Sequence, residues 1–516
     1  MDTSSLDTNY GMGSTSEGPP KEKKGGNFAR DALKLVGGTT LAQIITILTA
    51  PILSRLFAPD AFGVLAVFTS LVSLIGVVIC LRYEFAIMMP ERDEEAANVF
   101  ALSILIAGLL SGLVAVVIYY AYETILKVLR VPDLAPYLWL LPVALLIHGV
   151  FQALNYWNSR LRHFGSLSIS RVAASLTTSF MPMVLSTLGR SDAGGLIWSW
   201  MTGSTVFTLT LAGQVWRTSK EIFRKSLHIE RMLVSLKRYR KFPLVDSWSG
   251  FINSTSWQLP SLFLAFFFSD TVVGYFSMAS RIILLPMSLI GNAIAQVFFQ
   301  RTTSQRQEPH QMAHTAEAVF RILVAISWLP SFALTILGKD LFIVIFGETW
   351  AEAGIYVEIL GMWMFFLFIS SPMSTLVLTR ERQEQGLVMN TLIFGSRLVS
   401  LVIGGLFGNP FLAMALWSFT GIIVYGGWAI LNLTLAGVSL RSGLSAFLRY
   451  FIFSLPWMAI LVLTRWFIKN PSWLIPIICG IVILANYLVI LRKDRALFRP
   501  IFSALSIFPN NNSHEG

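Results

Sequence analysis

The chain has 516 residues, of which 54% are hydrophobic and only 13% are charged, and its mean hydropathy is +0.65. A soluble domain carries about 25% charged residues, so this composition excludes a water-soluble protein of this size and predicts a surface covered largely by lipid. The net charge of +11 would suit a nucleic-acid partner, but the positive residues lie in short segments between apolar spans. The positive-inside rule explains them better, and no nucleic acid is expected to bind.

Apolar runs recur between short polar breaks, and each is long enough to cross roughly 30 Å of hydrocarbon. They cover residues 33–56, 61–81, 97–120, 134–157, 167–188, 195–216, 244–268, 271–299, 316–337, 355–378, 387–407, 410–435, 446–467 and 473–491. A further apolar stretch, 339–347, is too short to cross. The sequence predicts an all-α polytopic membrane protein with about fourteen transmembrane helices.

Positive charge concentrates on one side of this predicted topology. If the N-terminus lies inside, every inside segment is basic, and the longest, 217–241, is dense in Lys and Arg. The outside segments carry few positive residues. This pattern predicts an even number of crossings, with both termini in the cytoplasm.

The basic segment divides the chain near its middle and defines the predicted domains. We expect a disordered cytoplasmic tail, an N-lobe of six helices, a basic cytoplasmic inter-lobe loop, a C-lobe of six helices, and two last helices with a cytoplasmic tail. These occupy residues 1–26, 27–216, 217–243, 244–436 and 437–516.

A weak internal repeat relates the two halves. An acidic turn precedes Gly63 in the first half, and a similar acidic turn precedes Gly274 in the second, a shift of 211 positions. Both turns fall outside in the predicted topology, so the halves would be parallel repeats about an axis along the membrane normal. Similar turn chemistry arising by chance is the alternative.

The motifs of common membrane enzymes are missing from the sequence. There is no GxxxxGK[ST], HExxH, paired CxxC or GxSxG pattern, and the two cysteines, Cys80 and Cys479, lie in apolar surroundings. We expect no catalytic residue, no bound metal and no cofactor. A coupling ion, H⁺ or Na⁺, is left open.

The most informative residues are charges inside the predicted spans, since each costs about 2.5–3.5 kcal/mol at a helix centre. Arg281 lies near the middle of the eighth span. Two interpretations of Arg281 are equally favoured. It forms a buried ion pair with Asp246 or Glu358, or it is an anion site in a water-filled cavity. For Arg397, in the eleventh span, the buried pair is favoured. Arg55, at the outer end of the first span, fits an interface anchor or a cavity rim.

Polar amides also occur inside the spans, where they suit interhelical hydrogen bonds or a polar substrate such as a sugar. They are Gln43, Gln152, Asn155, Asn253, Gln258, Asn292, Gln296 and Asn390. At 3.6 residues per turn, Arg281, Asn292 and Gln296 would line one stripe of a continuous eighth helix. This stripe is the predicted wall of a substrate cavity. Further candidates for lining that cavity are Asn253, Gln258, Arg55 and Arg397.

Several short motifs resemble Wzx-type oligosaccharide flippases of the multidrug/oligosaccharidyl-lipid/polysaccharide exporter superfamily. In chain order they are Phe28-Ala-Arg30 through Arg55 and Gly63, the run 237–243, Asn253, Gln258-Leu-Pro260, the run 274–277, Arg281, Leu285-Pro286, the run 341–347, Trp350, Ala353-Gly354, Ser370-Ser-Pro372 and Glu381-Arg-Gln383. The resemblance implies two six-helix lobes around a central cavity, with two extra C-terminal helices. It also implies transfer of an undecaprenyl-pyrophosphate-linked oligosaccharide, with Arg281, and more weakly Arg55, attracting the pyrophosphate.

The expected protein is therefore a flippase of the bacterial cytoplasmic (inner) membrane, serving O-antigen, capsule or exopolysaccharide synthesis. Its expected partners are the lipid-linked oligosaccharide, membrane lipids, a polysaccharide polymerase and other assembly proteins. A drug exporter of the same fold is the first alternative, although it would favour buried acids over buried arginines. A membrane-embedded glycan-processing enzyme is the second.

Overall fold

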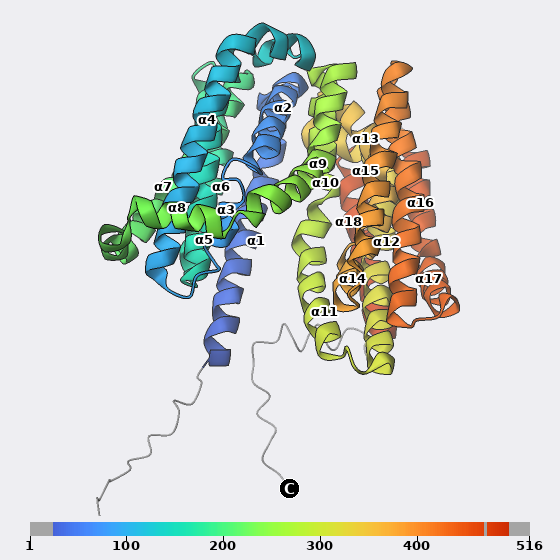
Figure 1. The fold of residues 1–516 in the computed structure, drawn as a ribbon. Coiled ribbons are helices and arrows are strands. Elements are labelled where there is room, and N and C mark those ends of the chain that lie inside the picture. The colour runs from blue at the N-terminus through green and yellow to red at the C-terminus, as the bar shows by residue number, and fades with distance from the viewer. Residues whose placement is uncertain (1–23, 469–471, 495–516) are drawn as a thin grey trace, which may run out of the picture.

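The computed structural model describes residues 24–468 and 472–494, and the regular structure in that part of the chain is helical (Figure 1). The first half contains α1 (Lys24–Leu56), α2 (Pro59–Gly76), α3 (Tyr83–Ala86), α4 (Asp93–Leu129), η1 (Pro132–Leu140), α5 (Leu141–Arg160), α6 (Phe164–Thr187), α7 (Ala193–Ser226) and α8 (Ile229–Arg238). The second half contains η2 (Phe242–Asp246), α9 (Ser247–Phe267), α10 (Asp270–Ile283), η3 (Met287–Gly291), α11 (Asn292–Ser304), α12 (Pro309–Phe346), η4 (Glu348–Trp350), α13 (Ala351–Ser370), η5 (Pro372–Ser374), α14 (Thr375–Thr379), α15 (Gln383–Leu406), α16 (Pro410–Ala436), α17 (Leu440–Phe467) and α18 (Leu474–Lys493).

Each predicted span falls on one helix or on two or three consecutive helical segments, which confirms the all-α, multi-pass fold. Within the described residues, 11 helical segments are both long enough and apolar enough to cross a membrane. The predicted spans on α6, α7 and α9 are not among them, because these helices carry many Ser, Thr and other polar residues. The count of fourteen crossings therefore stays a prediction.

The helices form two bundles that lie side by side in Figure 1, an N-lobe (α1 to α7) on the left and a C-lobe (α9 to α18) on the right. In the N-lobe α1 packs along α6, α6 along α7, and α4 along α5. In the C-lobe α12 packs along α13 and α15 along α16, while α17 and α18 cover α12. The lobes meet mainly where α2 contacts α9 and α10. This is the predicted two-lobe arrangement with two additional C-terminal helices.

The contact between α2 and α10 is made by equivalent positions of the two halves. Gly63 lies against the backbone of Asp270, and Gly274 lies against the backbone of Pro59. A Cβ at either glycine would overlap the facing carbonyl oxygen, so the approach requires residues without a side chain. Both contacts obey the shift of 211 positions (274 minus 63, and 270 minus 59). The halves therefore meet through a locally symmetric contact.

The segment predicted as an inter-lobe loop, 217–243, is mostly helical. α7 continues to Ser226, and α8 follows and lies across the N-lobe (Figure 1). The apolar residues of α8 recur at helical spacing, so one side packs on the protein through Met232, while Ile229 and Leu233 are exposed. The end of the molecule that carries this segment is called the basic end below, and the end with Gly63 and Gly274 the opposite end.

Two predicted tails lie largely outside the described residues. Of the tail 1–26, residues 24–26 belong to the first turn of α1 and the rest is outside. The tail that follows α18 is outside as well, beyond residue 494.

The predicted eighth helix, 271–299, is not continuous. α10 ends at Ile283, a π-helical segment follows at η3, and α11 begins at Asn292. Pro286 explains the break, because proline has no backbone N–H and its ring clashes with the carbonyl four residues earlier. The apolar stretch 339–347, in contrast, is almost entirely the last part of the long helix α12.

Candidate functional site

A cavity of about 280 Å³ lies between the lobes, and Arg281 is on its wall. The N-lobe contributes one face of α1, and the C-lobe contributes the end of α10 and the start of the π-helical turn. The lining residues are Gln43, Thr46, Ile47, Ala50, Arg281, Ile282, Leu284, Leu285 and Ser288. Arg281 lies deep in the molecule, yet its side chain is exposed to solvent because it faces this cavity.

Arg281 makes no hydrogen bond or ion pair with any described residue, and neither predicted acidic partner reaches it. Asp246 accepts a hydrogen bond from Arg82 Nε at 3.0 Å. Glu358 pairs with Arg465 at 3.0 Å and also accepts the backbone N–H of Lys339 at 3.2 Å. A guanidinium without a carboxylate partner keeps its charge and its five donors available to an anion.

The polar wall of the cavity joins the two lobes directly. The hydroxyl of Ser288 donates a hydrogen bond of 3.3 Å to Gln43 Oε1. Thr46, one turn further along α1, lies 3.1 Å from the hydroxyl of Ser175 on α6. The remaining lining residues are apolar, so the cavity combines one free cation, a few hydrogen-bonding groups and aliphatic surface.

Arg397 has a different environment inside the C-lobe. It is 2% exposed, and it donates to the Tyr425 hydroxyl at 3.1 Å and to the Ser256 carbonyl at 3.3 Å. Its guanidinium lies over the rings of Trp257 at 4.8 Å and Trp417 at 5.3 Å. The buried position that the sequence favoured is present, but the partners are aromatic rings and neutral oxygens in place of a carboxylate.

The other predicted site residues do not line this cavity. Asn292, Gln296 and Asn253 are exposed elsewhere on α11 and α9, Gln258 is half-buried on α9, and Arg55 is exposed in the last turn of α1. The stripe of Arg281, Asn292 and Gln296 assumed regular α-helical spacing, and the π-helical turn between them changes the phase of the helix.

Sequence reasoning missed three polar residues of the cavity: Gln43 was noted but not assigned to it, and Thr46 and Ser288 were not considered. Gln43 stands out as an amide within an apolar span, which is a usable signal. Thr46 and Ser288 gave none, because hydroxyl residues are common in membrane helices and often bond their own helix.

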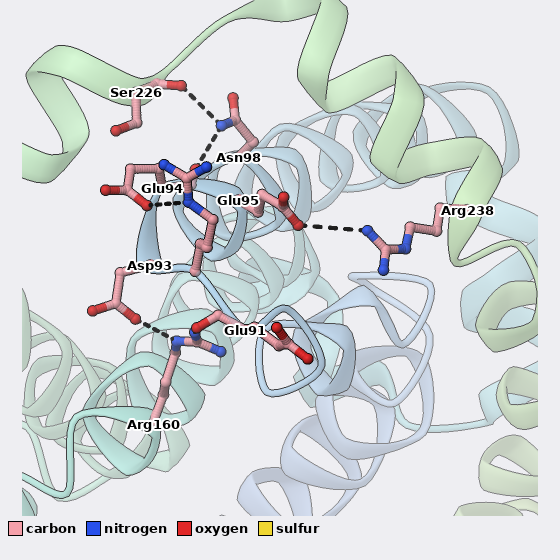
Figure 2. Close-up of polar contacts among 9 residues, drawn as sticks. Glu91, Asp93, Glu94, Glu95, Asn98, Arg160, Ser226 and Arg238 are labelled. Carbon is pink, nitrogen blue, oxygen red and sulfur yellow. Dashed lines mark hydrogen bonds and ion pairs between the residues drawn. The ribbon is translucent and has the colours of Figure 1, made fainter. Parts of the chain in front are cut away.

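A second cavity, of about 380 Å³, lies at the basic end between the start of α4 and α8. Four charged residues of its wall form ion pairs with one another (Figure 2), and Arg231 lines it as well. Arg160 donates to Asp93 at 2.9 Å, Arg238 to Glu95 at 3.4 Å, and Arg92 lies 3.5 Å from Glu94. These pairs tie α4 to α5 and to α8, so they brace the N-lobe.

Asn98 of α4 also connects this helix to the segment between α7 and α8. Its side-chain amide donates to the Ser226 carbonyl at 2.8 Å (Figure 2). Its oxygen accepts the backbone N–H of His228 at 3.0 Å, so Asn98 holds the turn between α7 and α8. Within residues 24–468 and 472–494, no three His, Cys, Asp or Glu side chains gather in a way that could hold a metal ion.

The fold is that of solved membrane transporters. The chain is similar to the lipid II flippase MurJ in an inward closed conformation, with a TM-score of 0.69 and 14% identity, over 90% of this chain and 99% of that one. It is also similar to an inward-facing multidrug resistance transporter of the MATE family, with a TM-score of 0.56 and 14% identity, over 78% and 95% of the two chains.

The model of the polysaccharide biosynthesis protein family matches residues 52–355, and the chain belongs to this family. Its relatives include the lipopolysaccharide biosynthesis protein WzxC of Escherichia coli (strain K12), 22% identical over 75% of each chain. They also include the succinoglycan biosynthesis transport protein ExoT of Rhizobium meliloti (strain 1021), 23% identical over 70% of this chain and 71% of that one. These matches confirm the resemblance to Wzx-type proteins.

Proposed function

We propose that this protein is a flippase that moves an undecaprenyl-pyrophosphate-linked oligosaccharide across the bacterial cytoplasmic membrane during synthesis of a surface polysaccharide. The observation that carries the proposal is Arg281, an unpaired guanidinium on the wall of a cavity between two lobes. A lipid-linked oligosaccharide has an anionic head that such a group binds, and its transfer requires no bond chemistry. The polymerase and other assembly proteins of the same pathway are the proposed partners.

The anionic head explains why an arginine is needed. Pyrophosphate carries at least two negative charges, and Arg offers charge-assisted bidentate hydrogen bonds to phosphate oxygens. One Arg does not neutralise this head, so a second cation is required. Arg171 on α6 is our candidate, since its Nη1 donates to Thr39 on α1 at 2.6 Å, one helical turn from Gln43.

The size of the cavity indicates that the lobes must move. About 280 Å³ is below the range of roughly 300–1,000 Å³ that encloses drug-sized ligands, so the cavity can hold the head but not a whole oligosaccharide. Gln43, Thr46 and Ser288 can bond sugar hydroxyls. Separation of the lobes would break the bond between Gln43 and Ser288 and enlarge the space beside Arg281.

Alternating access about the α2–α10 contact supplies this movement. The close packing of Gly63 and Gly274 holds the lobes together at the opposite end, while the cavity lies further along α1 and α10. Rocking of one lobe against the other around a shared site is the common behaviour of two-lobed transporters. In this proposal the basic end faces the cytoplasm, with both chain termini on that side.

The test uses the full-length protein in proteoliposomes with a radiolabelled undecaprenyl-pyrophosphate-linked oligosaccharide on the inner leaflet. Translocation is the fraction of glycan that an added glycosidase can cleave. We expect the wild-type protein to expose the glycan, and Arg281→Ala to do so about 100-fold more slowly. Arg301→Ala, at an exposed arginine of α11, is the matched control and should match the wild type. Wild-type translocation by Arg281→Ala would remove the central observation.

A further inference from the structure

The chain between α2 and α4 holds an arginine and a glutamate in an unusual conformation at the basic end. Leu81 and Arg82 have positive φ angles of 48° and 63°, a region that residues with a side chain rarely adopt. Glu84 follows on the short helix α3 and is only 2% exposed. A hydrogen bond of 2.8 Å from the Tyr83 hydroxyl to the Leu236 carbonyl anchors this segment to α8.

Arg82 is shared between two carboxylates that belong to different lobes. Its Nε donates to Asp246 Oδ2 at 3.0 Å, while its Nη1 lies 3.9 Å from Glu84 Oε1. Its guanidinium also lies against Gly250 of α9, where a Cβ would leave no room for it. Asp246 and Gly250 are in the second half of the chain, so Arg82 links the N-lobe to the C-lobe.

Glu84 interacts with Arg82 more weakly than Asp246 does, since its oxygen is 3.9 Å away and that of Asp246 is 3.0 Å away. Its Oε2 has no hydrogen-bond partner among the described residues. Burial raises the pKa of Glu84 to about 7, although its own backbone N–H and Arg82 act in the opposite direction. The ionisable groups that interact with it are Arg82 beside it, Asp246 of η2, Tyr156 of α5 and Cys80 of the preceding turn. From α4 and α8, the apolar side chains of Leu102, Ile106 and Met232 pack around the neighbouring Tyr83.

We propose that Glu84 is a proton-binding site of the transport cycle, and that its protonation state decides whether Arg82 holds the two lobes together through Asp246. This inference rests on the proposed flippase function, since it supplies the coupling ion of that cycle. A protonated Glu84 is neutral and needs no cation, so Arg82 stays on Asp246. Once the proton leaves, the buried carboxylate competes for Arg82 and weakens the link between the lobes.

The direction of the pH effect follows from the raised pKa. In the linked state Glu84 binds a proton more tightly than an exposed glutamate, whose pKa is near 4.5. Protonation therefore favours the linked state, and this preference is lost as the pH rises toward 7. A proton bound from one side of the membrane and released to the other would bias the lobes toward one direction of movement.

The experiment measures the distance between the lobes without substrate. Spin labels are placed on Met89→Cys and Trp248→Cys, two exposed positions of the N-lobe and C-lobe, in full-length protein in lipid nanodiscs. Cys80 and Cys479 are buried and stay unlabelled. Between about pH 5.5 and about pH 8.5 we expect the wild-type distance to lengthen, because the proton leaves Glu84 over this range. Glu84→Gln should keep the short distance throughout, and Asp246→Asn the long one.

The matched control is Glu358→Gln, at a carboxylate that pairs with Arg465 at 3.0 Å inside the C-lobe. Its pH response should equal that of the wild type. A wild-type response in Glu84→Gln would overturn the inference, as would a long distance in that variant at every pH.

A second measurement separates this inference from the proposed function. Oligosaccharide translocation is measured in the same variants with and without an imposed pH gradient, and Glu84→Gln should lose the effect of the gradient. If the distance responds through Glu84 but no oligosaccharide moves, the proposed function fails and the proton site stands. If translocation depends on Arg281 while Glu84→Gln keeps its response to the gradient, the proton site fails and the function stands.

Discussion

Two arginines in the interior of the C-lobe, Arg281 and Arg397, show how differently a membrane protein can use the same side chain. Arg397 donates hydrogen bonds to Tyr425 and Ser256 and is covered by two tryptophan rings. Arg281 has no such partners and faces a cavity. The guanidinium of Arg397 binds groups of its own chain, whereas that of Arg281 is available to bind a ligand.

The difference teaches that a charge inside a predicted span is a weak indicator of function until its surroundings are known. Removal of a buried cation that bonds to groups of its own chain damages the fold, because those groups lose their partner. Removal of a cation in an open cavity damages binding alone, because water replaces the side chain. Stability and transport should therefore respond in opposite ways at the two positions, and the variants of the two arginines are tested for both.

The largest effect is expected for Arg397→Ala. The change removes two hydrogen bonds and two ring contacts from a closed site, at a cost of about 3 kcal/mol or more. The folded fraction after heating, measured by size-exclusion chromatography, should fall strongly, while transport per folded molecule remains. A stable variant that does not transport would place Arg397 on the substrate path.

Arg281 should show the reverse pattern. We expect Arg281→Ala to lose translocation by about 100-fold, equivalent to about 2.7 kcal/mol, with unchanged thermal stability. Arg281→Lys tests what kind of interaction is lost: it should recover much of the rate if charge is sufficient, and little if the planar fork must bind two phosphate oxygens. Loss of folded Arg281→Ala protein would assign Arg281 to the fold instead.

A smaller effect on stability is expected for Tyr425→Phe, which removes one acceptor of Arg397 and keeps the ring. Hydrogen bonds to charged groups contribute about 1.5–3 kcal/mol, and the melting temperature should fall accordingly. Tyr119→Phe, at a tyrosine that is 69% exposed, is the control and should leave the melting temperature unchanged. Equal melting of the two variants would mean that the Tyr425 hydroxyl does not stabilise the site of Arg397, which would then be held by Ser256 and the tryptophan rings.

The smallest effect is expected at the polar wall beside Arg281. Gln43→Ala and Ser288→Ala each break the bond of 3.3 Å between the lobes and remove one group that can meet the substrate. A neutral hydrogen bond contributes about 0.5–1.5 kcal/mol, so translocation should change by about 2- to 10-fold without loss of stability. An unchanged rate in both variants would restrict substrate recognition to the cations.

Hydropathy predicted the positions of the helices well, because apolar length is a local property of the sequence. It could not predict the break after Ile283, although Pro286 marks the place, since proline is tolerated in many membrane helices. Because of the π-helical turn at this break, Asn292 and Gln296 do not line the cavity beside Arg281. Helical structure in the basic segment was missed for a related reason: a short amphipathic helix such as α8 has no long apolar run.

Partners of the charges could not be predicted, because they come from distant parts of the chain. Asp246 was considered for Arg281 but pairs with Arg82, 164 positions earlier. Glu358 was considered for the same arginine and pairs with Arg465. That the side chain of Arg281 faces a cavity is likewise visible only once the two lobes are packed together.

The reciprocal contact of Gly63 and Gly274 has a consequence for the origin of the fold. Gly63 contacts the carbonyl of Asp270 in the second half, and Gly274 contacts the carbonyl of Pro59 in the first. Pro59 and Asp270 are themselves equivalent positions of the two halves. This is the pattern of an isologous dimer, in which one surface pairs with its own copy. A single-lobe ancestor could have formed the same contact twice across a two-fold axis, and fusion of two copies would have preserved both. A later change at one glycine no longer alters the other, so each lobe is free to specialise.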